Sequence, residues 1–76
     1  MFTDIKNRIE SEEVKAVLSL SIGYPTSEKV KNIVQSYVTK SDHHLYGMMN
    51  QTSIVGCIGF KIRHSNQATI LNIAVL

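Results

Sequence analysis

Residues 53–76 have the sequence SIVGCIGFKIRHSNQATILNIAVL, and this stretch decides the fold of the chain. From Ile54 to Ile62 every even position is apolar or glycine, an alternation that predicts a β-strand. From Ala68 to Leu76 both alternating faces are apolar except at Thr69 and Asn72, which predicts a strand covered on both sides. Because four polar residues separate the two strands, the stretch predicts an antiparallel hairpin.

Two amphipathic helices are predicted upstream. Ser11 has the side chain of an N-cap and opens a helix over 11–22, which Gly23 ends because glycine tolerates a left-handed turn. A second helix is predicted over 27–40, capped by Thr26 or Ser27. Their apolar residues recur at helical spacing: Val14, Val17, Leu18 and Ile22 in the first, and Val30, Ile33, Val34, Tyr37 and Val38 in the second.

The remaining segments complete an α+β domain. Residues 43–50 predict a further strand, and residues 2–9 predict either a short first strand or a helical lead-in. The expected order is β-α-α-β-β-β in one domain over residues 1–76. Two helices then pack on one face of a mainly antiparallel sheet of three or four strands. The last strand would keep an unpaired edge and an uncovered face, so we expect dimerisation through the open sheet, or a missing half.

Charge is distributed unevenly along the chain. The net charge is +2, and residues 1–42 hold all six carboxylates together with six of the eight Lys and Arg residues. The acid-free remainder, with Lys61 and Arg63, would suit an anionic partner, although core strands also have little room for charge. A nucleic-acid binder is the weakest class, since the charge is low and no aromatic stacking pair is evident beside these basic residues.

The single cysteine and the histidines offer little chemistry. Cys57 is the only cysteine, so an internal disulfide is excluded, and its place in an apolar strand predicts an inert thiol. His43 and His44 are adjacent on a predicted strand and point to opposite faces, so we expect no shared metal. No apolar run approaches the length of a membrane span, and we expect a cytoplasmic protein without a membrane partner.

Three segments carry a resemblance to a known family. They are Val55–Phe60, Leu71–Leu76 and the break between the helices at Gly23–Thr26. In this order and at this spacing, the whole chain resembles the N-terminal half of the GNAT N-acetyltransferase superfamily. The resemblance implies a truncated acyl-CoA N-acyltransferase fold that transfers acetyl from acetyl-CoA to a primary amine of a small molecule or peptide.

The resemblance also implies where cofactor and substrate would bind. In the family, the pantetheine arm of acetyl-CoA pairs like a strand with the backbone of the fourth strand, which implies cofactor contacts at Ile73, Ala74 and Val75. The loop around Tyr24 would border the amine substrate. Asn72 is a polar side chain deep in the last strand, and it either orients the substrate or is a core amide satisfied by its neighbours. The catalytic residue stays unassigned.

One part of the family pattern is missing from these residues. The turn that holds the cofactor pyrophosphate, Gln/Arg-x-x-Gly-x-Gly/Ala, would begin just after Leu76. We therefore expect these residues alone to bind CoA weakly or not at all and to be inactive. The alternative hypothesis is a non-catalytic interaction module that dimerises through its sheet.

Overall fold

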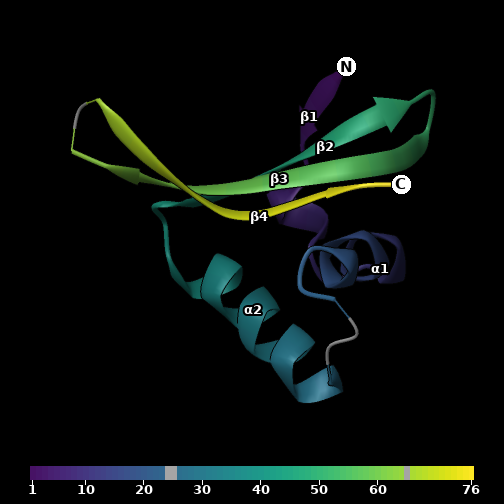
Figure 1. Ribbon diagram of the computed structural model, residues 1–76, viewed down its shortest axis with the longest axis horizontal. Helices are drawn as coiled ribbons and strands as arrows, with labels where there is room; N and C mark the ends of the chain where they lie inside the picture. Colours follow the sequence, from purple (N-terminus) through teal and green to yellow (C-terminus); the bar gives the residue numbers. More distant parts are fainter. Residues whose placement is uncertain (24–25, 65) are drawn as a thin grey trace.

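The computed structural model describes residues 1–23, 26–64 and 66–76, and Figure 1 shows its arrangement. The predicted order β-α-α-β-β-β is confirmed, with one short 3-10 helix, η1, added after the first strand. Both alternatives for the opening residues are thus realised in turn. The elements are β1 (Phe2–Asp4), η1 (Lys6–Arg8), α1 (Glu12–Leu20), α2 (Ser27–Thr39), β2 (His43–Asn50), β3 (Ser53–Arg63) and β4 (Gln67–Val75).

The four strands form one antiparallel sheet in the order β1-β2-β3-β4, so each strand pairs with its neighbours in sequence. β1 and β4 are therefore its two edge strands. Both helices lie on the same side of the sheet, as Figure 1 shows, which confirms the predicted layers. The unpaired edge expected for the last strand is present at β4.

Side-chain caps begin both helices as the sequence predicts. The Ser11 hydroxyl accepts from the Val14 amide at 3.2 Å, and the Thr26 hydroxyl accepts from the Lys29 amide at 3.2 Å. The first helix ends at Leu20, two residues earlier than predicted. The Leu18 carbonyl accepts from both the amide and the hydroxyl of Ser21, which closes the last turn.

The core lies between the helices and the sheet. Its largest fully buried side chains are Tyr37, Ile5, Leu18, Leu45 and Val14. These join both helices, the segment after β1 and strand β2 into one apolar layer. The predicted stripe of the second helix is wrong at one position: Val38 is 51% exposed, because it lines an open groove beside η1 rather than the core.

A β-bulge breaks the predicted alternation of β3. Met48 pairs with Gly56 and Met49 with Ile54, so Val55 is an extra residue on β3. The bulge turns Ile54 to the helix side, where it is 3% exposed and packs in the core. The sequence placed Ile54 on the same face as Ile58, and that assignment is wrong for this physical reason.

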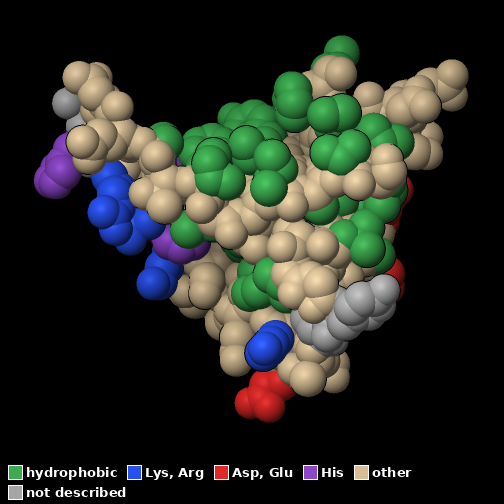
Figure 2. Space-filling model, in the orientation of Figure 1, with side chains coloured by type: hydrophobic (Ala, Val, Ile, Leu, Met, Phe, Trp, Pro, Cys, Tyr) green, Lys and Arg blue, Asp and Glu red, His purple; other side chains and the backbone are tan. Residues whose placement is uncertain are grey.

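The second face of the sheet, here called the open face, is covered by no element of the described chain. Figure 2 shows hydrophobic side chains gathered along the side of the sheet opposite the helices. The expected lack of cover on this side is thus confirmed for residues 1–23, 26–64 and 66–76. By strand register, the large apolar side chains of the open face are Phe2, Tyr46, Met48, Ile58, Phe60, Ile62, Ile70, Ile73 and Val75.

Candidate functional site

The free edge of β4 contains the residues at which the family resemblance implies cofactor contacts. The Leu76 amide donates to the Val55 carbonyl at 2.8 Å, which fixes the phase of the β3–β4 ladder. Because backbone groups in an antiparallel ladder alternate in direction, Ala74 turns its amide and carbonyl toward β3. Ile73 and Val75 turn theirs outward, away from β3. The edge therefore presents alternate backbone donors and acceptors that an extended amide chain could pair with.

A second bulge shapes β4 beside this edge. Asn72 pairs with Gly59 and Ile70 with Phe60, which leaves Leu71 as an extra residue. Such a bulge bends the strand and strengthens its local twist. Ile73 and Val75, whose backbone groups point outward, follow this bend in the chain. The bend therefore sets the direction in which the free edge continues.

Close contact between β3 and β4 depends on a glycine. A Cβ at Gly56 would lie 2.8 Å from the Ala74 carbonyl oxygen, a backbone atom that cannot move aside. Glycine thus allows the two backbones to approach and holds β4 in the sheet. Gly56 therefore helps to fix the position of the β4 segment that contains Ile73 and Val75.

Asn72, predicted to face substrate or to be a core amide, lies on the helix side of β4. It is 9% exposed. Its amide oxygen accepts from the Tyr37 hydroxyl at 2.7 Å, and its amide nitrogen donates to the Ser21 hydroxyl at 3.0 Å. These bonds join β4 to both the second helix and the end of the first. Its neighbours satisfy the amide through side chains rather than backbone, and a substrate contact stays a prediction.

Tyr37 is the partner that holds Asn72 in place. Burial, with a smaller effect from Cys57, raises the pKa of the Tyr37 phenol to about 12. Its hydroxyl fits because a Cβ at Gly59 would lie 1.8 Å from it. The Tyr37 phenol therefore occupies the space that a side chain at position 59 would need. Tyr37 stays neutral at physiological pH and serves as a hydrogen-bond donor.

Tyr24, predicted to border the amine substrate, lies outside the described residues. Cys57 is buried on the helix side, and burial raises the pKa of its thiol. A raised pKa keeps the thiol protonated and poorly nucleophilic. The expectation of an unreactive cysteine agrees with this environment.

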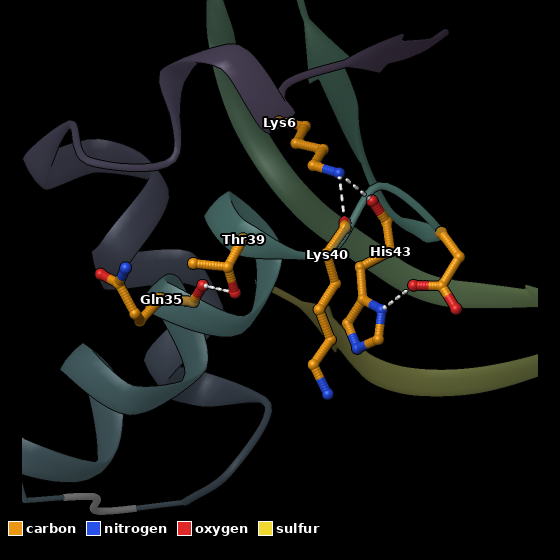
Figure 3. Close-up of polar contacts among 6 residues, drawn as sticks. Lys6, Gln35, Thr39, Lys40 and His43 are labelled. Atoms are coloured by element: carbon orange, nitrogen blue, oxygen red, sulfur yellow. Dashed lines mark hydrogen bonds and ion pairs between the residues drawn. The ribbon is translucent and has the colours of Figure 1, made fainter.

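His43 and His44 point to opposite faces, as predicted. His43 is 7% exposed, and its Nδ1 lies 2.9 Å from the Asp42 carboxylate, a contact drawn in Figure 3. The hydrogen bond to His43 lowers the pKa of Asp42 below its usual value. The Lys6 ammonium donates to the carbonyls of Lys40 and His43, also in Figure 3. Lys6 thus ties η1 to the start of β2.

A row of stacked rings on the open face, formed by His44, Phe60 and Tyr46, was not predicted from the sequence. The ring of Phe60 stacks against His44 at 5.4 Å and against Tyr46 at 5.9 Å between centroids. This row lies on the opposite side of β3 from Lys61 and Arg63, the basic residues beside which the sequence offered no stacking pair. Only the β2–β3 register brings its three rings together. Aligning the alternating patterns of β2 and β3 as neighbouring strands could have predicted this aromatic row.

The other sequence candidates do not join the β4 edge. Lys61 and Arg63 alternate with Phe60 and Ile62 and so belong to the helix side of β3. Within the described ranges, no group of three or more His, Cys, Asp or Glu side chains is placed to hold a metal ion. Nor does any helix among them have the length and apolarity needed to cross a membrane.

A groove of about 600 Å³ lies at the opposite edge of the sheet, by β1 and η1. It contains none of the residues predicted for cofactor or substrate. Its lining is Asp4, Lys6, Asn7, Ile9, Glu10 and Val38.

Comparisons with protein-family models and with curated protein sequences find no match to this chain.

Proposed function

We propose that these residues form the N-terminal half of an N-acetyltransferase of the GNAT type, and that the β4 edge binds the pantetheine arm of acetyl-CoA. The observation that carries the proposal is the free edge of β4, with the outward amides and carbonyls of Ile73 and Val75. Two further observations support it. The order of elements is the one that the resemblance implies, and the bulge at Leu71 bends the strand beside the edge.

The residues present fit an extended amide chain at this position. Pantetheine contains two amide groups, which can pair with a strand edge as a peptide does. Acetyl-CoA would supply the acetyl group as a thioester, and the acceptor would be a primary amine. An outward N–H of Ile73 or Val75 would donate to the thioester carbonyl and favour the charge that develops there. The strand also fixes the direction of the arm, which lowers the entropy cost of reaction.

The chemistry of this proposal needs a phosphate cradle that these residues do not contain. Binding by these residues alone is therefore expected to be weak and to come from the pantetheine arm. The helix side of β4, where the buried Asn72 is hydrogen-bonded to Tyr37 and Ser21, would support the edge. We place the activity in the cytoplasm, since the lone thiol of Cys57 suits a reducing compartment.

Amide chemical shifts of the labelled protein test the proposal. Millimolar pantetheine should shift the amide signals of Ile73 and Val75, whereas adenosine 3′,5′-bisphosphate at the same concentration should leave them unchanged. Val75→Pro removes one outward N–H without removing a ladder bond, and it should reduce the shift at Ile73.

Two results would contradict the proposal. The first is a pantetheine response confined to residues outside β4. The second is sub-micromolar binding of acetyl-CoA that Val75→Pro leaves unchanged, which would place the cofactor elsewhere and remove the need for a cradle.

The open face favours a second candidate function, a non-catalytic module that associates through its sheet. Phe2, Ile70 and Ile73 are each more than half exposed on this face. A module of this kind would show association without any response of β4 amides to pantetheine. The two candidates are thus separated by the same titration.

A further inference from the structure

We propose that the open face is the interface of a two-fold symmetric dimer, in which the open face of a second copy covers it and the two sheets pack as a sandwich. This inference does not require acyl transfer, and it specifies the surface that the second candidate function would use. The partner is a second copy of this chain because two such faces meet without like-charge repulsion, and because the area and the relief of the face suit pairing with itself.

The charge on the open face permits self-association. Lys61 and Arg63 alternate to the other side of β3, so no Lys or Arg of the described strands belongs to the open face by register. Asp4 pairs with Tyr46 at the rim, and its carboxylate accepts from the Lys6 amide at 2.9 Å, which turns it toward η1. Two identical faces can therefore meet without bringing like charges together, whereas a nucleic acid would find no cation there.

The area is of the size that a stable dimer uses. Strand spacing of about 4.8 Å and a rise of about 3.3 Å per residue give a sheet face of roughly 500 Å² in projection. Stable complexes bury roughly 800 Å² of accessible surface on each partner, a measure that is larger than the projected area of the same face because side chains stand out from it. Five apolar side chains on this face are 46–69% exposed, and they are Phe2, Ile62, Ile70, Ile73 and Val75. An apolar patch of this extent is unusual on a monomer.

The relief of the face suits a two-fold axis parallel to the strands. A hollow of about 320 Å³ extends over β1, β2 and β3, and it is lined by Phe2, Tyr46, Ile58 and Phe60. Ile70 and Ile73 project from β4 at 55% and 61% exposure. An axis in this direction places β4 of one copy over β1 of the other. Ile70 and Ile73 of each copy then lie over the β1 side of the partner copy's hollow, and the symmetry produces this contact twice. Sheets packed in this way lie about 10 Å apart, as in a β-sandwich.

Face-to-face packing leaves the β4 edge free. The outward backbone groups of Ile73 and Val75 point along the plane of the sheet, whereas the proposed interface lies on its face. Cofactor binding at the edge and association through the face are therefore separate events. Either one can fail while the other holds.

Light scattering over a concentration series tests the inference. At tens of micromolar the chain should have twice the 8.5 kDa mass of one copy. Ile70→Lys should raise the dissociation constant at least about 100-fold, because it buries an unpaired charge in an apolar interface. Val38→Lys is the matched control: it replaces an apolar side chain of similar exposure, 51% against 55%, on the helix layer. It should leave the dissociation constant unchanged.

Three outcomes would overturn the inference. One is a monomer at millimolar concentration. Another is association that Ile70→Lys leaves intact, with circular dichroism showing that the variant is folded. The third is a dimer that Val75→Pro abolishes while Ile70→Lys does not, which would assign the contact to pairing of β4 edges.

Discussion

The two faces of the sheet share their strands but differ in residue size and in cover. On the helix side, Gly47 and Gly59 leave room for the side chains of Ile5 and Tyr37. On the open face, the neighbouring positions carry Ile58 and Phe60, among the largest side chains of the chain, with no described element above them. The apolar residues of the helix side are therefore packed in the core, whereas those of the open face are not covered by any described element.

Apolar character alone therefore does not mark the core of this fold. Ile54 and Ile70 are the same residue type on neighbouring strands, yet they are 3% and 55% exposed. The helix side is fixed by close steric fits and by the hydrogen bonds of Asn72. The open face depends on what packs against it.

The largest effect is expected from Gly59→Ala on the helix side. The new Cβ would lie 1.8 Å from the Tyr37 hydroxyl and 2.8 Å from its ring carbon Cζ. Overpacking of this kind should lower the free energy of unfolding by about 3 kcal/mol or more, measured by urea denaturation. Gly47→Ala should cost less, since its nearest neighbour is the movable end of the Ile5 side chain.

Combining Gly59→Ala with a second substitution tests whether the loss of stability comes from contact with Tyr37. Tyr37→Phe removes the closest clashing atom, so it should recover part of the stability lost in Gly59→Ala. Strict additivity of the two losses would show that the phenol does not occupy the space over Gly59.

An intermediate effect is expected at alkaline pH. The folded pKa of Tyr37 is raised from 10.0 to about 12, so the unfolded chain loses this proton first. Stability is therefore unaffected below pH 10 and falls as the pH rises from 10 to 12, by up to about 1.4 kcal/mol per unit. Urea denaturation across this range measures the slope. Tyr37→Phe should lack this component, and an equal slope in both proteins would contradict the assignment.

The smallest effect is expected on the open face in dilute solution. Ile70→Ala should change the free energy of unfolding by less than about 1 kcal/mol at concentrations where the chain is monomeric. Ile54→Ala, the same truncation on the helix side, should cost about 2 kcal/mol or more. Equal losses would erase the distinction between the two faces.

Much of the fold could be predicted because local signals were consistent. The helices begin where Ser11 and Thr26 can cap them, and the strands match the apolar alternation within one residue at most ends. The errors lie where tertiary contacts override the pattern. The bulge at Val55 depends on the register of β2 and β3, and no periodicity within β3 contains that information.

The candidate site was predictable only in part. The apolar run identified β4, and Asn72 was conspicuous as a polar residue within it. Its partners, Tyr37 and Ser21, are 35 and 51 residues away, so their hydrogen bonds follow from packing alone. The stacked row of His44, Phe60 and Tyr46 is likewise a product of cross-strand register.

Local residue patterns were enough to set the order of elements, the positions of the helix caps and the surplus of apolar residues in the last two strands. These follow from the conformational preferences of neighbouring residues, which act over a few positions of the chain. Three further features arise from packing in the folded chain: which apolar residues are buried, which backbone groups of β4 face outward, and the hydrogen bonds that join Asn72 to α2 and to the end of α1. Those outcomes depend on strand register and helix placement, because contacts between distant residues form only once the chain is folded.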